Sequence, residues 1–125
     1  MNLNQDYILR MVESLGRFAA KLMKKETSDL DGLHMESLST EDILPIILKK
    51  LLHEAKYGEA EDLLYRELER NPTKSTCDMA LSFYKEINAK SDEELEAAGF
   101  PREEIVEGLT DLGRILRRLE EKGKE

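Results

Sequence analysis

Cysteine, tryptophan, proline and long hydrophobic runs are scarce or missing in this sequence of 125 residues. The single cysteine, Cys77, excludes a disulfide within the chain and is typical of a reducing compartment. The longest uncharged apolar run, ILPIIL at 43–48, is far too short to cross a membrane as a helix. No apolar run follows a basic N-terminal start, so the sequence predicts no integral membrane association. We expect a cytoplasmic protein.

Basic residues are outnumbered by acidic residues, 19 to 27, which gives a formal net charge of −8. This charge argues against a nucleic-acid partner, because phosphate contacts need a basic surface. The imbalance is uneven: residues 1–25 carry five bases and two acids, whereas residues 26–101 carry eight bases and 18 acids. A basic N-terminal helix over an acidic body could dock on another copy or on a membrane surface. Alternatively, its lysines only favour the negative end of their own helix.

Helix breakers are few, and apolar residues recur at helical spacing along most of the chain. The sequence therefore predicts an all-α fold without strands, a compact bundle of five to six helices in one domain over residues 1–125. The expected helices begin near residue 4, between 40 and 44, at 58, after 73 or 75, after 91 and at 101. Residues 26–39 are expected to form an ordered connection.

The second expected helix contains a proline near its start and is unusually apolar. Pro45 is tolerated in a first turn but removes a hydrogen bond inside a helix. The helix therefore begins either near Leu44, with Pro45 at its first position, or at Thr40, with a slight kink. Because its apolar side chains cover much of the circumference, we expect it to be the most buried helix.

Signals for helix ends are strongest in the second half of the chain. Thr73 or Ser75 can cap the fourth helix. Ser91 and Glu94 have the spacing of a capping box, which predicts a short helix. Gly99 suits the left-handed residue that ends such a helix.

Residues 40–72 resemble a single tetratricopeptide-like helical hairpin, in which a small residue lets the second helix approach the first. Two positions depart from that pattern, because Leu48 and Glu67 stand where small residues are expected. No second copy follows 34 residues later, so the hairpin implies packing geometry and no peptide-binding groove. The residues expected to pack the hairpin are Leu44, Ile47, Leu51, Tyr57, Ala60, Leu64 and Pro72.

Two further segments, NQDYILRMVESLGR at 4–17 and SDEELEAAGFPREEIVEGL at 91–109, carry a wider resemblance. Together they resemble a family of small, all-helical, uncharacterised Firmicutes proteins that is defined as a domain of unknown function. The resemblance covers nearly the whole chain. It implies a bacterial, cytoplasmic origin and no activity, and it assigns no functional residues.

No pattern of catalytic, cofactor-binding or metal-binding residues emerges, so we expect no cofactor. His34 and His53 are the only histidines, and neither lies in a spaced ligand pair. The DLDG stretch at 29–32 lacks the later acidic positions of a calcium loop. Cys77 lies on the apolar stripe of its helix, where a cysteine usually acts as a small hydrophobe.

The terminal helices carry long apolar stripes, and Gly16, Gly108 and Gly113 allow close backbone approach. These helices either pair with each other in the core or offer the N-terminal helix as an interface, for example in a homodimer. We favour a non-enzymatic interaction module whose protein partner the sequence does not identify. The candidate interaction surface consists of Ile8, Met11, Val12, Leu15, Phe18 and Leu22.

Two alternative functions remain open. One is a small ligand-binding protein or enzyme with an inter-helical pocket lined by Tyr57, Tyr65, Tyr84 and nearby acids. The other is peripheral docking of the basic N-terminal helix on a membrane surface.

Overall fold

The computed structural model describes residues 5–22 and 40–123, and every regular element in these ranges is an α-helix. The predicted all-α class is therefore confirmed for the described residues. The predicted connection at 26–39 lies outside them. The helices are α1 (Gln5–Leu22), α2 (Thr40–His53), α3 (Tyr57–Arg70), α4 (Lys74–Asn88), α5 (Asp92–Ala97) and α6 (Arg102–Gly123).

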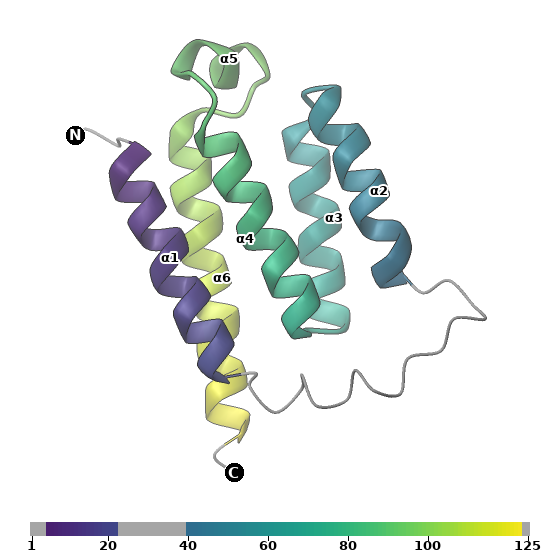
Figure 1. The fold of residues 1–125 in the computed structure, drawn as a ribbon, viewed down its shortest axis with the longest axis vertical. Helices are drawn as coiled ribbons and strands as arrows, with labels where there is room; N and C mark the ends of the chain where they lie inside the picture. The colour runs from purple at the N-terminus through teal and green to yellow at the C-terminus, as the bar shows by residue number, and fades with distance from the viewer. Residues whose placement is uncertain (1–4, 23–39, 124–125) are drawn as a thin grey trace.

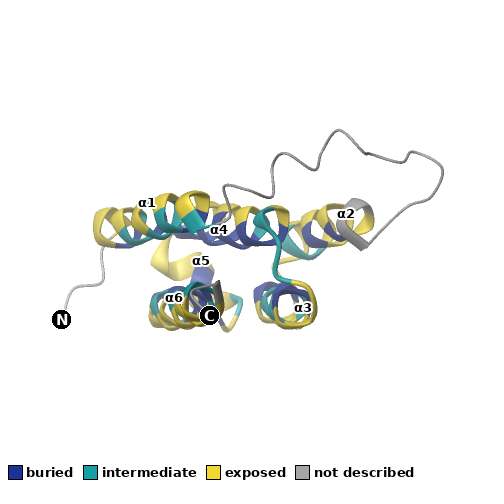
Figure 2. Ribbon diagram, turned by 90° about the horizontal axis from the view of Figure 1, so that it is seen from below, coloured by how far each residue is buried: buried dark blue, intermediate teal, exposed yellow. Residues whose placement is uncertain are grey.

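The five long helices form two layers, as Figure 2 shows in end view. The first layer contains α1, α4 and α2 side by side, and the second contains α6 and α3. The central helix, α4, contacts α1, α2, α3 and α6, whereas the short α5 lies across one end of the bundle (Figure 1). The compact bundle predicted from the sequence is confirmed.

The core is built from the apolar stripes that the sequence predicts. On α6 the fully buried residues are Ile105, Leu109, Leu112 and Leu116, spaced four and three apart. On α4 the buried stripe consists of Cys77, Ala80, Leu81, Tyr84 and Ile87, so Cys77 lies on the apolar side as predicted. Burial of these side chains removes apolar surface from water, which stabilises the bundle.

The predicted helix ends of the second half are confirmed. Thr73 caps α4, and its side chain accepts a hydrogen bond from the backbone N–H of Thr76. Ser91 and Glu94 form the capping box at the start of α5. Gly99 has a φ of +72°, in the left-handed region that glycine adopts without strain. The connection from α5 to α6 is thus determined by local chemistry.

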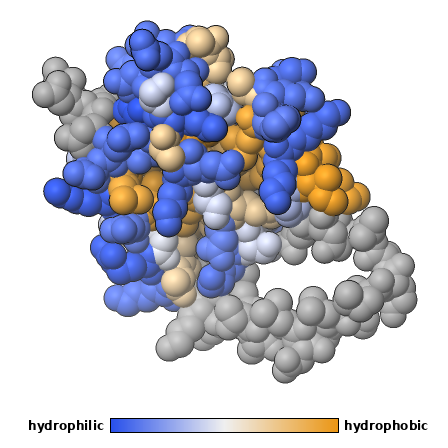
Figure 3. All heavy atoms as spheres, turned by 45° about the horizontal axis from the view of Figure 1, so that its top comes forward, coloured by the Kyte–Doolittle hydropathy of each residue, from blue (hydrophilic) through white to orange (hydrophobic). Residues whose placement is uncertain are grey.

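The predicted burial of α2 is wrong, although its start at Thr40 matches one of the two predicted starts and places Pro45 inside the helix. The side chain of Ile46 is 69 % exposed, and Ile43 and Ile47 are also exposed. The reason is position: α2 lies at the edge of its layer and contacts α3 and α4 along one face only. Figure 3 accordingly shows hydrophobic residues at the surface on the side of the molecule where α2 lies.

The helical pair α2–α3 forms as expected, but one of its packing positions differs from the prediction. Ile47 is 40 % exposed, and the neighbouring Leu48 is buried in its place. Leu48 takes the packing position because it lies four residues after the buried Leu44, on the same face of α2. That face packs against α3 and α4. The likeness of this pair to a tetratricopeptide hairpin remains a prediction.

The other hairpin positions are buried or half-buried. Tyr57, Ala60 and Leu64 are buried, whereas Leu51 and Pro72 are half-buried.

No helix in the described part of the chain is long and apolar enough to span a membrane.

Candidate functional site

A cleft of about 440 Å³ opens between α3 and α6 and is lined mainly by charged side chains. Six of its lining residues are acidic and two are arginines, so the cleft favours a cationic occupant. The lining residues are Glu61, Asp62, Tyr65 and Glu69 of α3, with Glu104, Glu107, Gly108, Asp111, Arg114, Ile115 and Arg118 of α6.

Two tyrosines and a glutamate converge beside this cleft. The hydroxyl oxygen of Tyr84, on α4, lies 2.5 Å from Oε2 of Glu61 and 3.1 Å from the hydroxyl oxygen of Tyr65. The Tyr65 hydroxyl donates a hydrogen bond to the carbonyl oxygen of Gly108. These four groups, hereafter the tyrosine chain, join α3, α4 and α6 through successive polar contacts.

The tyrosine chain exists because Gly108 has no side chain. A Cβ atom at this position would lie 2.6 Å from Cζ of Tyr84 and closer still to the hydroxyl oxygen. The sequence predicted close backbone approach at Gly108, and what the structure places there is the side chain of Tyr84 from α4. At Gly113 the nearest atom, Cδ2 of Leu15, would lie 3.5 Å from a Cβ atom, which is an ordinary contact.

Burial and neighbouring charge act together on Glu61. Burial raises the pKa of Glu61, whereas the hydrogen bond with Tyr84 lowers it. The negative charges of Glu104, Asp62 and Asp111 raise the pKa further, so the net direction is upward. A glutamate with a raised pKa beside a cleft is the usual mark of a functional site, although structural networks also produce it.

The pKa values of the two tyrosines are raised as well. Burial raises the pKa of Tyr65 and of Tyr84 well above the usual value for tyrosine. Both hydroxyls therefore stay neutral near neutral pH, and neither supplies a tyrosinate base or nucleophile.

The third tyrosine of the predicted pocket lies elsewhere. Tyr57 is buried, and its ring packs edge-to-face against Phe100 with the centroids 6.1 Å apart. Of the three tyrosines predicted to line a pocket, only Tyr65 lines the cleft. Tyr84 is fully buried and contacts Glu61 and Tyr65, and Tyr57 lies outside the cleft as well. The aromatic contact anchors the α5–α6 connection to α3.

A second groove, of about 580 Å³, lies between α1 and α6 and is hereafter the α1–α6 groove. Its apolar part comes from both helices, with Met11 and Leu15 on one side and Leu109 on the other. Three exposed arginines also line it. The lining residues are Tyr7, Arg10, Met11, Ser14, Leu15, Leu109, Thr110, Gly113, Arg114 and Arg117.

The predicted interaction surface divides between the core and this groove. Ile8 and Val12 are buried against the rest of the chain, together with Ala19. The remaining residues of the surface, Met11, Leu15, Phe18 and Leu22, are half-buried and pack against the core. Only Met11 and Leu15 of the predicted surface line the groove.

Metal and nucleophile chemistry find no support in the described residues. No group of three or more possible ligands occurs in the part of the chain that the structure describes. Cys77 is fully buried, and His53 is exposed. His34 and the DLDG stretch lie outside the described residues.

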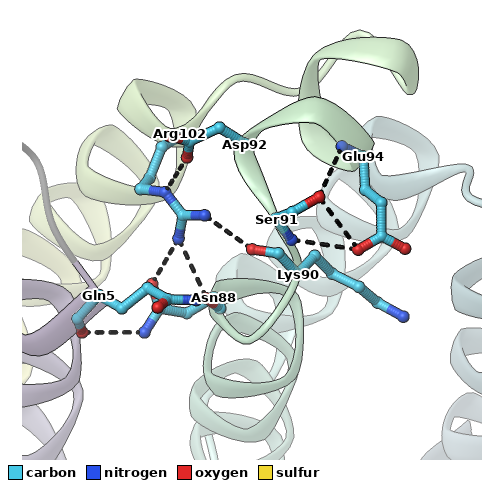
Figure 4. A network of polar contacts seen from close by, with 7 residues as sticks. All are labelled: Gln5, Asn88, Lys90, Ser91, Asp92, Glu94 and Arg102. Atoms are coloured by element: carbon cyan, nitrogen blue, oxygen red, sulfur yellow. Dashed lines mark hydrogen bonds and ion pairs between the residues drawn. The ribbon is translucent and has the colours of Figure 1, made fainter.

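A buried arginine that sequence reasoning missed connects α6 to α4 and α5 at one end of the bundle (Figure 4). Arg102 is only 9 % exposed. One of its terminal nitrogens, Nη1, donates to both the backbone oxygen and Oδ1 of Asn88, at 3.0 and 2.9 Å. Its other donors reach the carbonyl oxygen of Lys90 at 2.7 Å and Oδ1 of Asp92 at 2.6 Å.

The network continues from Asn88 to α1. Asn88 Nδ2 donates to the backbone oxygen of Gln5, and Gln5 Nε2 donates to the backbone oxygen of Asn88, at 3.1 and 2.9 Å. One feature of the sequence could have indicated the role of Arg102, which is the first residue of α6. A cation in the first turn of a helix is unfavourable next to the positive end of the helix dipole, so it needs other partners.

The comparisons with known proteins give a family and no described function. No curated protein and no solved structure matches the chain. A family of unknown function, DUF6483, matches residues 2–117, which is nearly the whole sequence. The chain belongs to this family.

Proposed function

We propose that the protein is a non-enzymatic helical interaction module that self-associates through the α1–α6 groove. The observation that carries the proposal is the combination of an apolar groove between two helices with exposed arginines along it. Half-buried apolar side chains such as Met11 and Leu15 gain further burial when a partner covers them.

The charge distribution supports a second copy as the occupant. Residues 26–101 carry ten more acids than bases, and the groove presents Arg10, Arg114 and Arg117. Opposite charges on two copies of one chain favour their encounter and fix their relative orientation. We also propose a cytoplasmic location, which the single cysteine supports.

The test is a comparison of molar mass by light scattering after size exclusion. Wild type is expected to form a dimer, and the double variant Arg10→Glu, Arg117→Glu to be monomeric, with dimer affinity about 100-fold weaker. Both arginines are exposed, so the variant should keep its helix content.

The control places a new glutamate on another exposed face. Ile46 on α2 is the most exposed large hydrophobic residue described, and Ile46→Glu should remain dimeric. A monomeric wild type overturns the proposal. An arginine variant that stays dimeric while Ile46→Glu becomes monomeric moves the interface to α2.

The second candidate function is binding of a small cationic ligand in the α3–α6 cleft, and six lining acids favour it. Spermidine is a suitable probe. It is expected to raise the melting temperature of wild type, and to raise it less in an Asp62→Asn, Glu107→Gln variant. An unchanged wild-type melting temperature at saturating spermidine counts against this candidate.

Membrane docking by α1 receives less support. Arg10, Arg17 and Lys21 are exposed, as an anionic surface would require. However, Ile8 and Val12 are buried within the bundle, so they cannot also enter a lipid layer.

A further inference from the structure

The tyrosine chain has more hydrogen-bond contacts than its tyrosines have hydrogens. Each hydroxyl carries one hydrogen, and a carbonyl oxygen carries none. Tyr65 uses its hydrogen on the carbonyl oxygen of Gly108. Tyr84 then has one hydrogen for two oxygens, Oε2 of Glu61 at 2.5 Å and the hydroxyl oxygen of Tyr65 at 3.1 Å. If Glu61 is ionised, one contact therefore lacks a hydrogen.

We propose that Glu61 is protonated in the folded protein and that the tyrosine chain is a proton-dependent latch between α3, α4 and α6. Glu61 then donates to Tyr84, Tyr84 donates to Tyr65, and Tyr65 donates to Gly108. Three hydrogens serve three contacts, all in one direction, and aligned hydrogen bonds strengthen one another.

The surroundings of Glu61 favour the protonated form. On its own helix Asp62 adds a negative charge, and from α6 Glu104 and Asp111 add two more. Of the two arginines that line the cleft from α6, Arg114 is exposed and pairs with Asp111 at 2.6 Å, so its charge is already partly balanced. These charges agree with the raised pKa of Glu61, whose largest cause is burial.

The latch makes stability depend on pH in a defined direction. The folded protein holds the Glu61 proton more tightly than the unfolded chain does, because the pKa is raised on folding. This contribution to stability is complete below the unfolded pKa of glutamate and is lost as the pH rises through the folded pKa. Ionisation of Glu61 therefore loosens the contact of α6 with α3 and α4, beside the acidic cleft.

Glu61→Gln tests the proposal, because its amide group donates a hydrogen bond to Tyr84 at every pH and carries no charge. Thermal unfolding is followed from about pH 4 to about pH 8. The melting temperatures of variant and wild type should nearly coincide at the acidic end. The variant should then lead by about 3–5 °C at the alkaline end.

Glu69→Gln is the control, since it removes one negative charge from the same cleft, and Glu69 belongs neither to the tyrosine chain nor to the charges that raise the pKa of Glu61. Its melting curve should retain the wild-type dependence on pH. A ¹³C NMR titration of the Glu61 carboxyl carbon in wild type provides a direct reading that needs no variant. Titration within the ordinary glutamate range overturns the proposal, as does a Glu61→Gln variant that is less stable than wild type at every pH.

Discussion

Replacement of Arg102 by leucine is expected to lower the free energy of unfolding by about 3–5 kcal/mol. The substitution removes every donor that satisfies Oδ1 of Asn88 and the carbonyl oxygen of Lys90 in the network of Figure 4. These acceptors lie beside a residue that is only 9 % exposed, where water is a poor replacement for the guanidinium. The effect should extend to α1, because Asn88 also holds Gln5.

Urea denaturation of wild type and Arg102→Leu measures this loss. Arg118→Leu is the matched control on the same helix, since Arg118 is exposed and lies outside the α1–α6 groove. It should change the free energy of unfolding by no more than about 0.5 kcal/mol. Arg102→Lys should recover little, because an ammonium group cannot reproduce the forked contacts to Asn88, Lys90 and Asp92. Equal losses for the leucine variants at 102 and 118 would show that the buried network has no special role.

Substitution of Gly108 by alanine is expected to have the next largest effect, a loss of about 2–3 kcal/mol. The new Cβ atom would lie 2.6 Å from Cζ of Tyr84, so the ring or α6 must move. Either movement disturbs the contacts of Tyr84 with Glu61 and Tyr65. This steric loss exceeds the gain of about 1 kcal/mol that alanine usually brings to a helix interior.

A second glycine of α6 provides the control. At Gly113 a Cβ atom meets only Leu15, at 3.5 Å, so Gly113→Ala should gain about 0.5–1 kcal/mol. Adding Tyr84→Leu to Gly108→Ala removes both Cζ and the hydroxyl oxygen, which collide with the new methyl group. The double variant should therefore be more stable than the sum of the two single effects predicts, by about 1 kcal/mol. Additive losses would contradict the steric explanation.

Elements with local signals could be predicted from the sequence. The Thr73 cap, the Ser91–Glu94 box and the left-handed Gly99 each depend on neighbouring residues, and all are present. The apolar stripe of α6 likewise determines which of its faces enters the core. Such signals require no knowledge of the partner helix.

Features that depend on neighbouring helices could be predicted only in part. The apolar residues of α2 suggested a central helix, yet its edge position leaves Ile46 exposed. Tyr65 could be named as a pocket residue, but its connection through Tyr84 to Glu61 depends on how closely α6 approaches α4. The buried role of Arg102 was not predicted, because its partners come from the end of α4 and from α5.

The most direct test of the central claim, self-association through the α1–α6 groove, is the molar mass of wild type in a dilution series at low and high salt. The proposal predicts a dimer at low salt that dissociates on dilution. Added salt should make the dimer dissociate at a higher protein concentration, because arginines contribute to the interface. A mass of one chain at every concentration and salt level would contradict it.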